Sequence, residues 1–137
     1  MARTGERQAR LGACGENARE ADLVALGCTP LLGDAYRGAL VFDIGGGSTE
    51  IIRLVRSTPG NDGQVEKRFA ASLPLGVVTL SERAPLNSRA DYDHLCAELT
   101  GRFAVLKESM PDFDPATEHL LGTSGTVTTL AAIALGL

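Results

Sequence analysis

Aromatic residues are scarce in this chain of 137 residues, which has no Trp, two Tyr and four Phe. The hydrophobic fraction is nevertheless 44%, against 22% charged residues. A core built of Leu, Val, Ile and Ala is therefore expected, as in α/β proteins, and extensive disorder is not. The length favours a single domain.

Paired cysteines are also missing. Cys14, Cys28 and Cys96 are odd in number and form no CxxC pair, which argues against a disulfide framework or a zinc site and fits a reducing cytoplasm. The two histidines, His94 and His119, are isolated from any nucleophile–base motif. A Ser–His catalytic triad is therefore not expected.

The sequence has neither a long apolar run nor a basic excess. No apolar run reaches 18 residues, and residues 1–20 carry charges throughout, so we expect no membrane helix and no signal peptide. The net charge is −4, from 13 basic and 17 acidic residues, which disfavours general nucleic-acid binding. Backbone amides can still hold a small anion, because they need no net positive charge. We expect a cytoplasmic protein without nucleic-acid or membrane partners.

Short β-branched runs and alternation predict four strands, at 39–43, 49–55, 65–73 and 118–123. Helices are predicted at 75–84, 88–110 and 124–137, with a weaker helical signal at 20–26 that Gly27 would cap. Apolar residues three and four apart make the helix at 88–110 amphipathic, with Ser88 as N-cap and a stripe of Tyr92, Leu95, Leu99, Phe103 and Leu106. The order predicts a mixed α/β sheet with flanking helices over residues 38–137, after an irregular segment at 1–37.

The stretch DIGGGSTE joins the first two predicted strands. Asp43 ends one strand and Glu50 returns on the next, so both carboxylates are expected at one rim of the sheet. Two carboxylates beside a phosphate need a cation between them, and oxygen ligands suit Mg²⁺, so Asp43 and Glu50 are the predicted metal ligands. The residues between them offer backbone N–H groups and hydroxyls that can cradle phosphate: Gly45, Gly46, Gly47, Ser48 and Thr49.

A second glycine-containing turn, GTSGT, lies between the last predicted strand and the last helix. The positive end of that helix would face the sheet rim, so its residues are predicted to bind phosphate: Gly122, Thr123, Ser124, Gly125 and Thr126. Each stretch also has a plainer interpretation, as a hairpin with solvated acids and as an ordinary helix start. DIGGGSTE is neither a Walker A loop nor a dinucleotide-binding loop, because no GKS or GKT follows it and it leads into a strand. The segment SLPLGVVTLSER at 72–83 has no acid–base pair and is expected to shape the cleft.

Three segments together resemble the exopolyphosphatase / guanosine pentaphosphate phosphohydrolase family: LVFDIGGGSTEII, SLPLGVVTLSER and LLGTSGTVTTLAAIALGL. They span residues 39–137. The resemblance implies the actin, sugar kinase and heat-shock ATPase superfamily, whose ribonuclease-H-like lobes enclose the active site. It also implies Mg²⁺-dependent hydrolysis of a terminal phosphoanhydride on polyphosphate or guanosine pentaphosphate. Glu20 matches the family's presumed base, and Asp43 and Glu50 match its metal-binding acids.

The family begins with an earlier lobe that carries another phosphate loop, and no such loop is found here. We therefore expect most of one lobe, with residues 1–37 as a remnant of the region between lobes, and impaired hydrolysis. Two alternatives stay open: a non-catalytic phosphate- or nucleotide-sensing module, and a kinase- or chaperone-like ATPase, which GGGSTE followed by SLPLG disfavours. The substrate and a homodimeric state are also left open.

Overall fold

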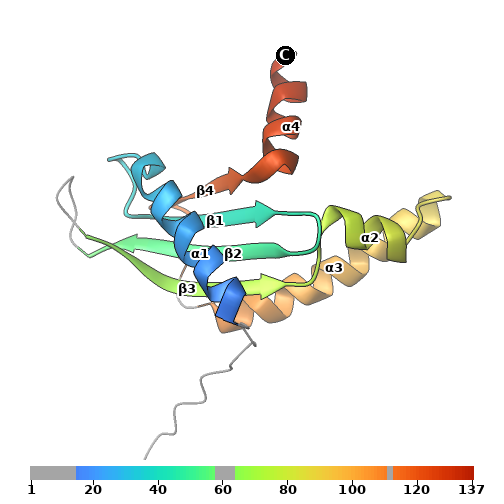
Figure 1. Cartoon of the computed structure of the whole chain (residues 1–137), viewed down its shortest axis with the longest axis horizontal. Coiled ribbons are helices and arrows are strands. Elements are labelled where there is room, and N and C mark those ends of the chain that lie inside the picture. Colours follow the sequence, from blue (N-terminus) through green and yellow to red (C-terminus); the bar gives the residue numbers. More distant parts are fainter. Residues whose placement is uncertain (1–14, 58–63, 111–112) are drawn as a thin grey trace, which may run out of the picture.

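The computed structural model describes residues 15–57, 64–110 and 113–137, with only the backbone of 15–18 and of Glu20. In chain order the elements are α1 (Gly15–Cys28), the 3₁₀ turn η1 (Thr29–Leu31), β1 (Gly38–Ile44), β2 (Thr49–Arg56), β3 (Val65–Leu73), α2 (Val77–Arg83), α3 (Arg89–Ser109), β4 (Glu118–Thr123) and α4 (Ser124–Leu135). Figure 1 shows the sheet seen with α1 crossing in front and α3 behind.

The sheet has four strands in the order β3-β2-β1-β4. Strand β1 pairs antiparallel with β2 and parallel with β4, and β2 pairs antiparallel with β3. The register of β3 shifts between Arg53 and Leu54, so that Arg68 has no partner of its own and forms a β-bulge. The predicted mixed α/β sheet with flanking helices is confirmed.

Each face of the sheet has its own apolar cluster. On one face Val41 and Ile52 pack with Ala25 and other small residues of α1. On the other face Ile51 and Ala71 pack with Leu106 of α3. The sheet is therefore the middle of three layers, in which α1 covers one face and α3 the other (Figure 1).

The N-terminal helix is longer than predicted. One or two helical turns were expected at 20–26, whereas α1 runs from Gly15 to Cys28 and includes Gly27 in its last turn. Helix α1 buries Ala21, Ala25 and Cys28 against the sheet, and this packing outweighs the poor helix propensity of its glycines. Residues 15–31 are thus helical and not irregular, while the proposed domain division at residue 38 stays a prediction.

A buried ion pair fastens the sheet across β1. The guanidinium of Arg53 on β2 donates Nε and a terminal nitrogen to the two carboxylate oxygens of Glu118 on β4, at 2.7 and 2.6 Å. Both residues are buried, at 6% and 3% exposure. Gly38 lies between them, where a Cβ would be 2.4 Å from the Leu54 carbonyl oxygen. The pair therefore locks the register of the two strands that flank β1.

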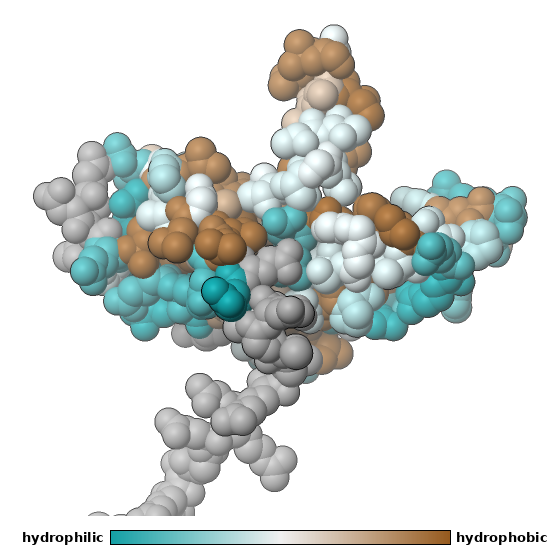
Figure 2. Space-filling model, viewed as in Figure 1, coloured by the Kyte–Doolittle hydropathy of each residue, from teal (hydrophilic) through white to brown (hydrophobic). Residues whose placement is uncertain are grey.

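Helices α3 and α4 leave much of their apolar surface exposed. Of the predicted α3 stripe, Leu106 is buried but Tyr92 and Phe103 are exposed. The N-cap at Ser88 is confirmed, since its hydroxyl accepts from the Asp91 N–H. Helix α4 stands away from the sheet in Figure 1, and Figure 2 shows hydrophobic side chains around its far half. None of the described helices combines the length and apolar character that a membrane span requires.

Candidate functional site

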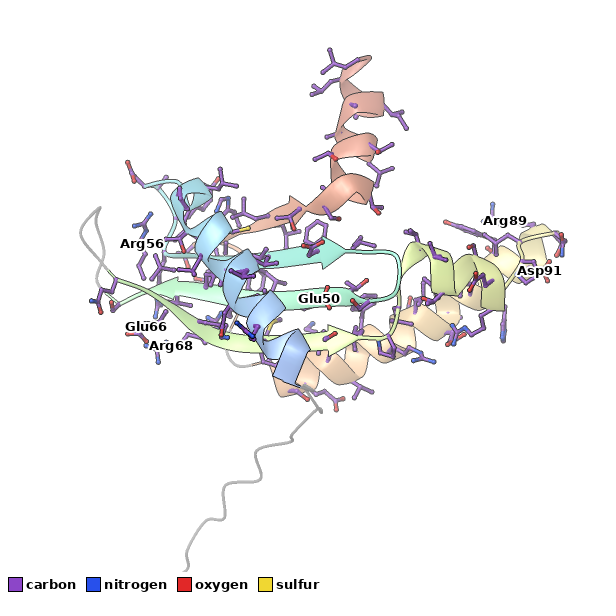
Figure 3. All side chains as sticks on the ribbon, in the orientation of Figure 1. Glu50, Arg56, Glu66, Arg68, Arg89 and Asp91 are labelled. Atoms are coloured by element: carbon purple, nitrogen blue, oxygen red, sulfur yellow. The ribbon has the colours of Figure 1, made fainter. Side chains whose placement is uncertain are left out.

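Four polar side chains form one row across the end of the sheet. Asp43 on β1 pairs with Glu50 on β2 and with Thr123 on β4, and Glu50 pairs with Ser72 on β3. Directly paired residues project from the same face, and in this row it is the face that α1 covers. Figure 3 shows Glu50 near the end of the sheet at which the β1–β2 hairpin turns. The register thus gathers one polar group from every strand.

Glu50 is held by a neighbour within this row. It is only 3% exposed, and the Ser72 hydroxyl donates to its Oε1 at 2.9 Å. Asp43 beside it is half-buried. Two carboxylates at this spacing repel each other unless a cation or a proton lies between them. No group of three or more His, Cys, Asp or Glu side chains that could hold a metal ion gathers within the described parts of the chain.

The C-terminal end of α1 lies on the same face of the sheet as the acidic row. Burial raises the pKa of the Cys28 thiol above its ordinary value, and the Asp43 carboxylate raises this pKa further. The Asp43 charge therefore acts on the thiol at the end of α1. The helix itself packs on the apolar cluster of the same face of the sheet.

The glycine loop is a tight turn supported by α2. The Gly45 N–H donates to the Ser48 carbonyl at 2.9 Å and closes the hairpin. The loop carbonyls point the other way, toward the first turn of α2: Gly45 O accepts from Val77 N, and Gly46 O accepts from Val78 N and Thr79 N. Among the described backbone groups, the N–H groups of Gly46, Gly47 and Ser48 find no carbonyl acceptor. These three residues are among the predicted phosphate donors of the loop, whereas the N–H of Gly45, also predicted, is engaged by Ser48.

The space around the glycines differs from one position to the next. A Cβ at Gly47 would meet nothing within 4 Å, and one at Gly46 would make ordinary contact with Val78. Positive φ is not the reason for the glycines either, because Gly136 is the single described glycine with one. The open space beside Gly47 is therefore consistent with close approach of a ligand.

Two predicted phosphate-binding residues have structural roles. The Thr49 side chain lies on the opposite face from Glu50, is buried, and donates to the Leu75 carbonyl at 2.5 Å. This hydrogen bond joins β2 to the segment before α2, and the Thr49 side chain does not face the acidic row. A Cβ at Gly122 would lie 2.5 Å from Val127 and 2.8 Å from Phe42. Gly122 is thus required by packing. Phosphate binding by Thr49 and Gly122 stays a prediction.

The second turn is fastened to the first. The hydroxyls of Ser124 and Thr126 both donate to the Ile44 carbonyl, at 2.8 and 3.0 Å. These hydroxyls are predicted phosphate donors, but in this structure they join the two loops. Ser124 has φ 74°, a left-handed conformation that costs a non-glycine residue about 1–3 kcal/mol and that is frequent at functional sites.

The side chain of Thr123 has an unsatisfied polar atom. Its Oγ1 is buried and has no hydrogen-bond partner within the described residues. Thr123 is the N-cap of α4, yet its side chain makes no capping bond. The first N–H groups of a helix lack internal acceptors, and Gly125 has open space around it. Three polar features therefore meet at Thr123: its hydroxyl, the first N–H groups of α4 and the carboxylate of its strand partner Asp43. The described residues do not supply hydrogen-bond partners for all of them.

Glu20 is only partly placed. Its backbone belongs to α1, the helix that packs over the face bearing Asp43 and Glu50. The side chain of Glu20 lies outside the described residues. Its role as a base stays a prediction.

The sequence profile of the Ppx/GppA phosphatase family matches residues 16–135 of this chain. The chain belongs to the Ppx/GppA phosphatase family. Among curated proteins, it is 35% identical over 97 residues to a bifunctional 3-dehydroquinate synthase/phosphatase of Fusobacterium nucleatum subsp. nucleatum. That match covers 69% of this chain and 13% of the relative.

Solved structures of the family have the same fold. An exopolyphosphatase-like protein superimposes with a TM-score of 0.66 at 32% identity, over 88% of this chain and 37% of the other. The Aquifex aeolicus PPX-GPPA enzyme gives 0.55 at 27% identity, over 74% of this chain and 30% of the other. This chain thus spans about a third of the length of these structures. The likeness confirms the predicted ribonuclease-H-like fold of the actin-like ATPase superfamily.

Sequence reasoning missed three members of the site. Ser72 was grouped with the residues that shape the cleft, although its hydroxyl donates to Glu50. Cys28 was considered only for a disulfide or a zinc site, yet the Asp43 charge raises the pKa of its thiol. The first turn of α2 was not connected to the glycine loop. Counting residue alternation along β2 and β3 would have pointed to Ser72, but only with the correct strand register.

Proposed function

We propose that this chain supplies the metal- and phosphate-holding wall of a phosphoanhydride hydrolase that releases terminal phosphate from inorganic polyphosphate or guanosine pentaphosphate. The observation that carries the proposal is the row formed by Thr123, Asp43 and Glu50. It lies between two sources of unengaged N–H groups, the glycine loop and the start of α4. Family membership supports the same reaction class.

The donor set fits Mg²⁺. This ion takes one or two carboxylates and fills its octahedron with water and substrate phosphate. Asp43 and Glu50 are adjacent acids, and the buried Thr123 Oγ1 beside them lacks a described partner. When bound, Mg²⁺ would neutralise charge on the phosphate oxygens in the transition state. Asp43 and Glu50 would hold it.

The remaining groups bind and orient the anion. The N–H groups of Gly46, Gly47 and Ser48 would hold phosphate oxygens on one side, and the start of α4 would hold them on the other. The bonds from Ser124 and Thr126 to Ile44 fix the spacing of these two elements. Phosphoryl transfer gains mainly from such positioning and charge neutralisation. A base such as Glu20 would add a factor of roughly 10²–10⁴.

The activity of this chain by itself is proposed to be slow. It spans 30–37% of the compared structures, and we propose that the acidic row supplies one wall of the active-site cleft. Water that enters an open site competes for the same donors and weakens their electrostatic effect. The alternative function, a phosphate- or nucleotide-sensing module without catalysis, would use the same donors and needs no base.

The decisive experiment measures phosphate release and phosphate binding on the same purified chain with Mg²⁺. Slow release that Glu50→Gln abolishes supports the hydrolase, because Glu50 lies in the acidic row. The matched control is Glu108→Gln, an exposed acid on α3. Binding without any release would favour the sensing module. If phosphate and Mg²⁺ show no mutual dependence in binding, both functions are wrong.

A further inference from the structure

Helix α2 contacts the glycine loop through its first turn and makes no anion site of its own. The N–H groups of Val77, Val78 and Thr79 donate to Gly45 O and Gly46 O at 3.0, 3.0 and 3.2 Å. These are the N–H groups that a helix leaves without internal acceptors. Here the loop carbonyls take them, so the helix start and the loop satisfy each other.

This pairing fixes the direction of two loop amides. A trans peptide is planar, and its carbonyl and N–H point in opposite directions. No cis peptide bond occurs in the described segments. Because Gly45 O points at α2, the Gly46 N–H points away from α2. Because Gly46 O also points at α2, the Gly47 N–H also points away from α2.

The contact between the helix and the loop allows no side chain. A Cβ at Gly76 would lie 2.1 Å from Gly46 O and 2.3 Å from Gly47 N, both of which are backbone atoms. The Thr79 hydroxyl accepts from Gly76 N–H and donates to Gly76 O, each at 3.0 Å. The Thr49 hydroxyl holds the preceding Leu75 carbonyl at 2.5 Å. Gly76 is thus held on both sides at the point of closest approach.

We infer that Gly76 and Thr79 are positioning residues for anion binding. They allow α2 to pack closely on the loop, and this contact orients the Gly46 and Gly47 N–H groups toward a bound phosphate group. The inference rests on the proposed function, which needs phosphate at this loop. It gives the SLPLG segment a role in affinity, because a loop whose amides are already aligned loses less conformational entropy when it binds. Neither residue touches the ligand.

The test uses the whole ¹⁵N-labelled chain with inorganic phosphate and Mg²⁺. Gly76→Ala is expected to weaken phosphate binding by about tenfold or more, the effect of losing one charge-assisted hydrogen bond. The Gly46 and Gly47 amide signals, which shift on phosphate addition in the parent, are expected to shift little in the variant. The control Gly101→Ala, where a Cβ meets nothing within 4 Å, should bind as the parent does.

A second pair of variants covers the case in which Gly76→Ala does not fold. Thr79→Val removes the hydroxyl and should weaken phosphate binding, whereas Thr79→Ser keeps the hydroxyl and should restore it. Ser81→Ala, on the exposed side of the same helix, serves as control. Parent-like binding and parent-like amide shifts in folded Gly76→Ala or in Thr79→Val would overturn the inference and leave the proposed function standing. A parent chain that binds no phosphate with Mg²⁺ would overturn both.

Discussion

Asp43 and Glu50 are direct cross-strand partners, with both carboxylates on the face of the sheet that α1 covers. Like charges in this position destabilise a strand pair, so these two carboxylates lower the stability of the hairpin. Ser72 offsets part of that cost at Glu50 through its hydrogen bond. The Mg²⁺ proposed above would offset the rest of that cost.

Asp43→Asn is expected to weaken Mg²⁺-dependent phosphate binding by at least about tenfold, since even residues behind the metal ligands cost 10–100-fold in metal affinity. The fold should survive, because the change relieves repulsion with Glu50. Calorimetric titration measures the binding, and Glu108→Gln is the control. Unchanged binding in Asp43→Asn would remove this residue from the metal site.

Ser72→Ala is expected to lower Mg²⁺ affinity by about tenfold, because the carboxylate of Glu50 loses the donor that orients it. Ser72→Thr keeps a hydroxyl and should retain most of the affinity. The two variants are compared by titration with Mg²⁺ at constant phosphate. If alanine and threonine behave alike, the hydroxyl does not orient Glu50.

Gly47→Ala separates ligand approach from chain conformation. The added Cβ meets no atom within 4 Å and φ is not positive there, so stability should rise by about 0.4–1 kcal/mol. Phosphate binding should nevertheless weaken, because the methyl group takes up space beside the loop amides. Urea unfolding and calorimetry test the two parts. A variant that is more stable and binds normally would show that the glycine serves only the turn.

Glu118→Gln is expected to lower the free energy of unfolding by about 3–5 kcal/mol, since the buried Arg53 guanidinium loses its bidentate carboxylate. The double variant Arg53→Met, Glu118→Leu should be considerably more stable than the single one, because no buried charge remains. Urea unfolding measures the free energy of unfolding of the parent and of both variants. A single variant as stable as the parent would mean that the ion pair contributes nothing to the sheet.

Cys28 should respond to pH in a way that reports on Asp43. Its pKa is raised by burial and by the Asp43 charge, so the folded state keeps the thiol proton to higher pH than the unfolded state. The stabilisation from Cys28 is complete below the ordinary thiol pKa and is lost as pH rises through the folded pKa. Asp43→Asn should lower that folded pKa, as measured by the pH dependence of Cys28 alkylation. An identical profile in both proteins would contradict their proximity.

Local signals in the sequence were enough for most elements. The hairpin of β1 and β2 follows from two β-branched runs joined by three glycines, and Ser88 marks the start of α3 as expected. The extent of α1 could not be predicted in this way. Gly15 and Gly27 disfavour a helix, and only the burial of Ala21 and Ala25 against the sheet explains why the helix includes them.

The sequence pointed to the acids and loops of the candidate site but not to the hydrogen bonds that connect them. Asp43 and Glu50 follow from strand ends, which are local features. The contact of Ser72 with Glu50 depends on a register that a bulge at Arg68 alters, and no local pattern gives it. The structural role of Thr49 depends on the face that its side chain occupies, and that of Gly122 depends on the side chains packed against it. Hydroxyls and glycines in a motif therefore indicate a site without assigning each residue to the ligand.

The hydrogen bond from Ser124 to Ile44 connects residues 80 positions apart. Strands β1, β2 and β3 form from neighbouring segments, whereas β4 must close a long loop before it pairs with β1. We expect the three-stranded part to form first and the second phosphate loop to dock last. A ligand that bridges the two loops would then act after the rate-limiting step of folding. Phosphate with Mg²⁺ should accordingly slow unfolding and leave the refolding rate nearly unchanged.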